Sequence, residues 1–131
     1  MHRCVAQAAS LLLGLGLSAA ALAQSLQRPF PATALRGELT FAAPPDVLLN
    51  GRPARLAPGS RIRGADNFVQ TPASLTGLKA VVHYTVEPAT GLLQDVWILH
   101  PEERARRPWP TTPDEAARWS FDPAAQAWSR P

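Results

Sequence analysis

The sequence has 131 residues, a formal net charge of +3 and a single cysteine, Cys4. Fourteen prolines are spread along the chain rather than gathered in a linker. They exclude a fold built on long helices, because proline removes a backbone donor and disrupts helix interiors.

The N-terminal segment has the organisation of a cleavable export signal. A positive charge at Arg3 precedes an apolar stretch from Val5 to Leu22, and this stretch ends in Ala21-Leu22-Ala23 before Gln24. The order and lengths of these parts are those of a secretory signal peptide, so residues 1–23 should be removed and the mature chain should be periplasmic. The alternative is an uncleaved membrane anchor, since the stretch approaches the roughly 20 residues that span a bilayer. Polar residues interrupt it, which favours cleavage.

Cleavage between Ala23 and Gln24 would remove Cys4 with the signal. The mature chain of 108 residues (131 minus 23) would then have no thiol, which excludes disulfides, cysteine nucleophiles and thiolate metal sites. A lipid anchor is not expected, because glutamine rather than cysteine follows the cleavage position. Twelve basic and ten acidic residues remain, a net charge of +2. Because an exported protein does not meet the genome, we do not expect nucleic acid as a partner. Because cleavage would remove the apolar segment, we do not expect stable membrane insertion of the mature chain.

The mature chain begins with a predicted extended leader, followed by short strands. Residues 24–34 lack apolar periodicity and form the leader. A first strand is predicted from Leu35 to Ala42 with a bend at Gly37, because glycine inside a strand marks a bulge or a close approach. Asn50-Gly51 separates two short runs, and both residues tolerate the positive φ of a type I′ hairpin turn. A further turn is predicted at residues 57–60, after which Arg61 would begin a new strand.

The strongest strand prediction is Lys79 to Glu87, where apolar and polar residues alternate as in a half-buried strand. The apolar face would comprise Ala80, Val82, Tyr84 and Val86, and the opposite face His83, Thr85 and Glu87. A turn at residues 88–91 would lead into a partner strand from Leu92 to Leu99. The end of this partner strand is apolar on both faces, which indicates that the C-terminal tail covers it.

The tail, residues 101–131, is rich in proline and tryptophan. Residues 101–107 predict a helical turn or two, with proline in the first position. Thr112-Pro113-Asp114-Glu115 is a capping box that starts a short helix. The last part, residues 119–128, is consistent either with another helix or with a hairpin. The spacing of two between Trp119 and Phe121 favours the hairpin.

These patterns predict a mainly β fold of about six short strands, a sandwich or a small barrel. The pattern Arg36-Gly37-Glu38-Leu39, the Asn50-Gly51 hairpin and the two strands around Gly91 resemble the small OB-type or related five-stranded barrels of exported bacterial proteins. The whole chain is similar to uncharacterised exported proteobacterial proteins with such a tail, a resemblance that implies no function. The expected domains are a barrel over residues 35–100 and a tail over residues 101–131 packed on it.

Arginines provide the first candidate binding site. Arg52, Arg55, Arg61 and Arg63 lie on neighbouring predicted strands, and the last two share a face. Clustered bases attract anions, so the functional interpretation is a patch for an anionic glycan or an envelope protein. The alternative is an ordinary solvated strand face whose charges protect a sheet edge.

Tryptophans provide the second candidate site, comprising Trp97, Trp109, Trp119 and Trp128. They could line a carbohydrate or peptide groove. The favoured alternative is that they fix the tail to the barrel, because large aromatic side chains dominate the core energetics of small domains.

A catalytic or metal site would have to use His83, Asp95 and His100. His83 should face residues 95–97 across the hairpin, so a His83–Asp95 contact is geometrically possible. The sequence has no nucleophile elbow, phosphate loop or HExxH motif, and two histidines are a weak basis for a zinc site. We therefore predict a non-catalytic binding or structural module without metal or cofactor. A small periplasmic enzyme or metal binder using these three residues is the alternative.

Overall fold

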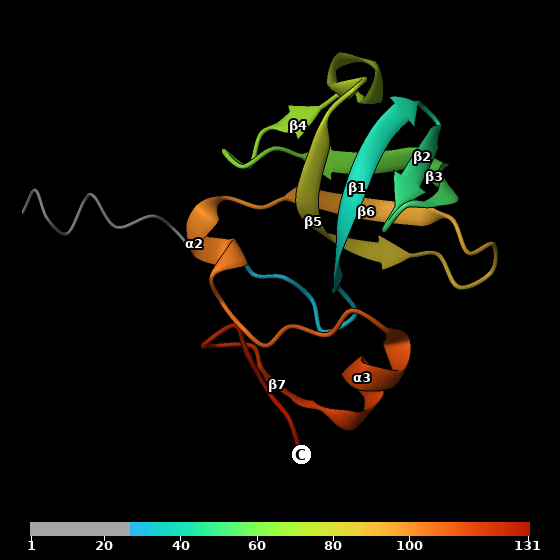
Figure 1. Ribbon diagram of the computed structural model, residues 1–131. Helices are drawn as coiled ribbons and strands as arrows, with labels where there is room; N and C mark the ends of the chain where they lie inside the picture. Colours follow the sequence, from blue (N-terminus) through green and yellow to red (C-terminus); the bar gives the residue numbers. More distant parts are fainter. Residues whose placement is uncertain (1–26) are drawn as a thin grey trace, which may run out of the picture.

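The computed structural model describes residues 27–131 (Figure 1). The predicted export signal, with its cleavage position after Ala23, lies outside the described residues, as do residues 24–26 of the leader. Among the described helices, none has the length and apolar character needed to cross a bilayer.

Five strands close into a barrel. They are β1 (Leu35–Ala43), β2 (Asp46–Leu49), β3 (Arg52–Arg63), β5 (Lys79–Val86) and β6 (Leu93–Ile98). Their order is β2-β1-β5-β6-β3, and a pairing between β2 and β3 closes the ring. Only β3 and β6 pair in parallel among these strands. A short strand, β4 (Val69–Gln70), extends the sheet beyond β3, and a 3₁₀ helix, η1 (Pro72–Leu75), follows it. The predicted mainly β, OB-like barrel of five to six strands is confirmed.

The local signals in the sequence explain much of this barrel. Asn50 and Gly51 have φ values of 54° and 82°, as the predicted hairpin turn between β2 and β3 requires. In β5, Val82 and Tyr84 point into the barrel core. That core contains ten buried residues: Leu35, Leu39, Phe41, Val47, Leu56, Ile62, Val82, Tyr84, Leu93 and Val96.

One predicted turn was wrong. Residues 57–60 do not reverse the chain but lie inside the twelve-residue strand β3. Between Leu56 and Arg61 the chain advances five residues while β6 advances two, from Leu93 to Asp95. The three extra residues form a large bulge in β3. Gly59 lies in this bulge and has a φ of +77°, which glycine adopts without strain.

The tail lies below the barrel in the view of Figure 1. It consists of α2 (Pro101–Arg104), α3 (Pro113–Arg118) and a hairpin of β7 (Ser120–Asp122) and β8 (Ala127–Ser129). Only half of the predicted capping box forms: the Glu115 N–H donates to Oγ1 of Thr112 at 3.2 Å, whereas the Glu115 carboxylate accepts the N–H of Thr111 rather than that of Thr112. Between the two open alternatives, the hairpin is the one observed, with Phe121 opposite Trp128.

A second hydrophobic core joins the leader, the barrel and the tail. It comprises Phe30, Ala34, Leu99, Trp109 and Trp128. The expected polar face of β5 was wrong at His83, which is fully buried. The reason is that leader and tail side chains cover the outer face of the barrel there, so β5 is buried on both sides at this point.

Candidate functional site

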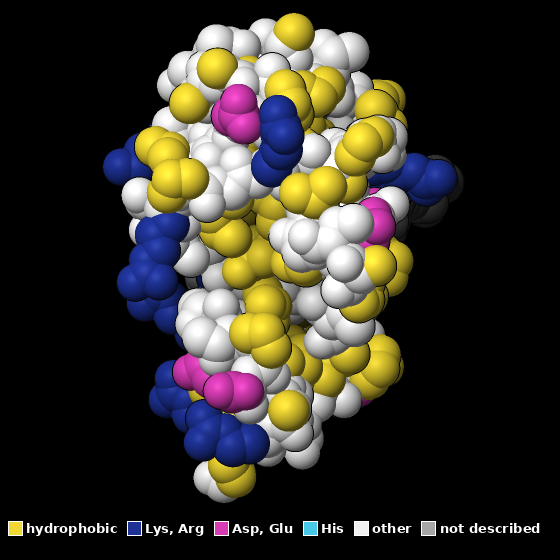
Figure 2. Space-filling view, turned by 90° about the vertical axis from the view of Figure 1, so that its right-hand side faces the viewer, with side chains coloured by type: hydrophobic (Ala, Val, Ile, Leu, Met, Phe, Trp, Pro, Cys, Tyr) yellow, Lys and Arg dark blue, Asp and Glu magenta, His cyan; other side chains and the backbone are white. Residues whose placement is uncertain are grey.

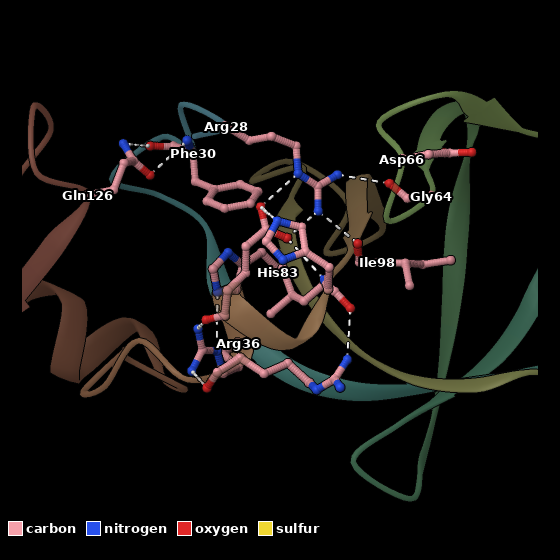
Figure 3. A network of polar contacts seen from close by, with 12 residues as sticks. Arg28, Phe30, Arg36, Gly64, Asp66, His83, Ile98 and Gln126 are labelled. Atoms are coloured by element: carbon pink, nitrogen blue, oxygen red, sulfur yellow. Dashed lines mark hydrogen bonds and ion pairs between the residues drawn. The ribbon is translucent and has the colours of Figure 1, made fainter. Parts of the chain in front are cut away.

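The junction of barrel, leader and tail holds a buried ion pair (Figure 3). Arg28 in the leader donates from Nε to Oε2 of Glu103 at 2.8 Å, and its Nη2 contacts Oε1 of the same carboxylate. The guanidinium also donates to the carbonyls of Gly64 (2.9 Å) and Ile98 (2.8 Å). Because Arg28 and Glu103 are 7% and 2% exposed, this pairing is almost free of solvent screening. One leader side chain thus connects α2 with two parts of the barrel.

A second arginine reaches the same region from β1. Arg36 donates from Nε to Nε2 of His83 at 3.2 Å, and its terminal nitrogens donate to the carbonyls of Glu103, Arg104 and Arg106. Since a guanidinium can only donate, Nε2 of His83 must accept, and the neutral imidazole carries its proton on Nδ1. That Nδ1 atom is buried and has no hydrogen-bond partner.

The environment strongly disfavours a charged imidazole. Burial, together with the positive charges of Arg36 and Arg28, lowers the pKa of His83 to about 2. Burial and the charge of Arg107 lower the pKa of Arg36 to about 10. His83 therefore stays neutral, its only lone pair is used by Arg36, and no solvent reaches it. This arrangement suits a structural imidazole better than a general base.

Aromatic rings enclose His83. Trp109 stacks on the imidazole with ring centroids 4.1 Å apart, and Phe30 meets it edge-on at 4.4 Å. The indole Nε1 of Trp109 donates to the Ala34 carbonyl at 3.0 Å, which binds the tail to the leader. Trp128 stacks on Phe121 at 4.8 Å in the hairpin. Trp97 and Trp119 are partly buried against the same second core, and Arg130 lies over the Trp119 ring.

Substitution of Trp109 by alanine should lower the free energy of unfolding by about 3–5 kcal/mol, as for other large buried aromatics. Trp109 is 5% exposed, and its loss would uncover His83 and Phe30. Thermal unfolding of a chain of residues 24–131 measures the effect. Trp119→Ala is the matched control, with a smaller loss expected because Trp119 is only partly buried. Equal melting temperatures for Trp109→Ala and the wild type would contradict the packing role.

The three residues of the enzyme alternative do not converge. His83 faces Trp97 across the β5–β6 ladder. Asp95 instead contacts Thr85, whose Oγ1 donates to the carboxylate at 3.3 Å. His100 precedes α2, with its Nε2 3.5 Å from Glu103. Within residues 27–131, no three His, Cys, Asp or Glu side chains group in a way that could hold a metal ion.

The four arginines of the predicted patch all lie on β3 but at its two ends. Arg52 and Arg55 lie by the hairpin turn, and Arg61 and Arg63 lie beyond the bulge. Arg55 is 3.4 Å from Asp46 in an exposed ion pair. The structure therefore divides the patch into two pairs, separated by the bulge.

Two hollows on the surface lie outside this junction. The larger, here called the barrel-end cavity, has a volume of about 630 Å³ and lies between residues 43–45, 56–60 and 72–76. The other, of about 450 Å³, lies at the waist between barrel and tail, where Leu35 and Val86 face Ala116 of α3. Hydrophobic side chains of this waist run down the middle of the face shown in Figure 2.

Comparison with protein families, with characterised proteins and with solved structures finds no match. The function must therefore be argued from the chemistry of the site.

Sequence reasoning overlooked the residues that organise the junction. Arg28, Arg36 and Glu103 were not singled out as site residues; Arg36 entered only as part of the pattern that resembles small barrels. The sequence contains only weak signals for the roles of these residues. Arg28 lies beside Phe30 in the leader, and Glu103 occupies the third helical position after His100, where an acid can cap a helix.

Proposed function

We propose that this chain is an exported, non-catalytic binding module whose partner is an acidic, partly apolar protein segment that binds at the barrel-end cavity. Export is supported by the signal-like residues 1–23. A non-catalytic role is supported by the ionisable groups of the junction, which are buried and bonded to one another. The observation that carries the binding role is the bulge of β3, because it forms one wall of the cavity.

The bulge interrupts the register between β3 and β6. Residues 57–60 have no register partner in β2, β4 or β6. Two hydrogen bonds hold the surrounding walls. The Leu56 N–H donates to the Pro45 carbonyl at 2.9 Å, and the Phe41 N–H donates to the Leu78 carbonyl at 2.9 Å. A preformed cavity beside a strand whose regular ladder is interrupted is suited to an extended chain that adds hydrogen bonds of its own.

The lining of this cavity is uncharged and mainly apolar. It includes three prolines, Pro44, Pro45 and Pro72, and the hydroxyls of Ser60 and Thr76. Arg55 and Arg61 are the sequence neighbours of the lining residues Leu56 and Ser60, and both are exposed. Basic groups beside an apolar cavity favour a segment that combines apolar side chains with acidic ones.

Exposed apolar side chains precede η1, which forms another wall. Phe68 and Val69 are 70% and 64% exposed, and Val69 pairs with Arg63 at the edge of the sheet. Exposed aromatic and aliphatic side chains of this kind mark protein contacts more often than glycan contacts when no ring lines the cavity. This favours an envelope protein over an anionic glycan.

The test is a selection of random peptides displayed on phage, with the mature chain, residues 24–131, as bait. Enriched peptides should contain acidic residues among apolar ones. Ala73→Trp should weaken their binding at least about tenfold, because an indole would fill the cavity from an exposed position on η1. Arg61→Glu should weaken binding by a similar factor through charge repulsion.

The matched control is Ala89→Trp, which places the same indole on an exposed loop between β5 and β6. It should bind the selected peptides like the wild type. Peptides that bind Ala73→Trp and Ala89→Trp equally well would contradict the proposed site. Failure of the bait to enrich any sequence, together with binding to acidic glycans on an array, would favour the glycan alternative.

A further inference from the structure

A third cavity lies between the segment after α2 and the β7–β8 hairpin, which run side by side in Figure 1. Its volume is about 290 Å³. Eight residues line it: Ala105, Arg106, Arg107, Pro108, Ala125, Gln126, Ala127 and Trp128. None of them is acidic. We call it the arginine cavity, and it is separate from the barrel-end cavity.

The two arginines have no acidic side chain beside them in the lining of the cavity. Arg106 donates a long hydrogen bond of 3.4 Å to Gln27, and Arg107 is exposed. The acid of the adjacent turn, Asp122, uses Oδ1 to accept the N–H groups of Ala124 and Ala125. The positive charge of the cavity is therefore left without a counter-charge among its lining residues.

A third guanidinium, that of Arg36, lies close to the cavity arginines and adds to the positive charge there. Arg36 donates to the carbonyls of Arg104 and Arg106, so it lies directly beneath the segment that carries the cavity arginines. The charge of Arg107 contributes, after burial, to the lowered pKa of Arg36. Arg36 uses all its donor nitrogens on protein acceptors and only adds electrostatic potential.

Trp128 supplies an independent observation. It lines the arginine cavity, it is 6% exposed, and its indole Nε1 is buried without a hydrogen-bond partner. An unpaired buried donor is costly, at about 1–3 kcal/mol, and native structures seldom leave one without a reason. By contrast, Nε1 of the neighbouring Trp109 has its partner in the Ala34 carbonyl. The side chain with the unpaired N–H is therefore part of the wall of the arginine cavity.

We propose that the arginine cavity binds a phosphate group, either as inorganic phosphate or as the terminal phosphate of a small phosphomonoester. Arginine forks match phosphate oxygens, and a phosphate offers enough acceptors for two guanidiniums at once. The cavity lies at the lower end of the range of ligand pockets, roughly 300–1,000 Å³, which suits a small molecule rather than a polymer. This site does not depend on the peptide site proposed above.

The experiment is an NMR titration of the mature chain labelled with ¹⁵N, following the indole N–H resonances of the tryptophans. Trp128→Phe assigns the resonance of Trp128. Inorganic phosphate and glycerol phosphate are titrated separately at constant ionic strength, against sodium chloride. The Trp128 resonance should move in a saturable way with phosphate. Saturation by inorganic phosphate identifies the free anion as sufficient, whereas saturation by glycerol phosphate alone identifies a phosphomonoester.

Arg107→Gln should weaken binding about tenfold to a hundredfold, the value of a hydrogen bond to a charged group. Arg107 is exposed, so this variant should fold, and its melting temperature checks that it does. Arg118→Gln, on the exposed side of α3, is the matched control and should titrate like the wild type. The proposal is overturned if neither phosphate moves the Trp128 resonance beyond the chloride control, or if Arg107→Gln and the wild type bind equally.

Discussion

Replacing Glu103 by leucine should lower the free energy of unfolding by about 3–5 kcal/mol, because the buried Arg28 guanidinium would lose its counter-charge. The loss extends beyond the pair, since Oε1 of Glu103 also accepts the His100 N–H at 3.1 Å. Urea unfolding of a chain of residues 24–131, followed by tryptophan fluorescence, measures the change.

Two further variants test the cause. Replacing both partners, Arg28→Met with Glu103→Leu, should recover part of the loss, because no unpaired charge would remain buried. Recovery should be incomplete, since the carbonyls of Gly64 and Ile98 would lose a donor. Glu38→Gln removes a carboxylate from an exposed pair with Lys79 and should cost only about 0–1 kcal/mol. If Glu103→Leu proved as mild as this control, the ion pair would not hold the junction.

Acidification should destabilise the protein through His83. Its ordinary pKa of 6.5 is lowered to about 2 in the folded chain, so the unfolded state binds the proton more tightly. The stabilising contribution is therefore complete above pH 6.5 and is lost progressively as the pH falls toward 2. The expected slope is about 1.4 kcal/mol per pH unit, or about 2 kcal/mol by pH 5.

The comparison with His83→Leu isolates this effect from the titration of carboxylates. Leucine lacks the proton-binding group, so the difference in unfolding free energy between wild type and variant should narrow as the pH falls from 6.5 to 5. His100→Gln is the control histidine variant, because His100 lies at the partly exposed start of α2. The assignment fails if wild type and His83→Leu lose stability in parallel over this range.

The elements that the sequence predicted correctly depend on neighbouring residues. The Asn50-Gly51 turn, the alternation of Val82 and Tyr84, and the N-cap of α3 at Thr112 are all set by residues a few positions apart. Such signals need no knowledge of the rest of the chain. They were enough for the mainly β fold class and for the hairpin on which the barrel depends.

The errors arose where distant segments decide the outcome. His83 looked like a polar-face residue, since alternation in a strand reports two faces but not what covers them. Its cover comes from Phe30 and Trp109, on opposite ends of the sequence. Arg28 and Glu103 are 75 residues apart, so no spacing rule connects them. The turn at residues 57–60 failed for another reason: proline and glycine also suit a bulge, and only the pairing with β6 distinguishes the two.

Two hydrogen bonds join Phe30 and Gln126, which lie near the two ends of the described chain, and they affect the order of folding. The Phe30 N–H donates to Oε1 of Gln126, and Gln126 donates in turn to the Phe30 carbonyl, a separation of 96 residues. Contacts of such high contact order form slowly, because the entropy of closing the loop must be met first. The second core can therefore close only after almost the whole chain has been delivered. The barrel core, by contrast, needs only residues 35–96, so the barrel can close before the tail docks on it.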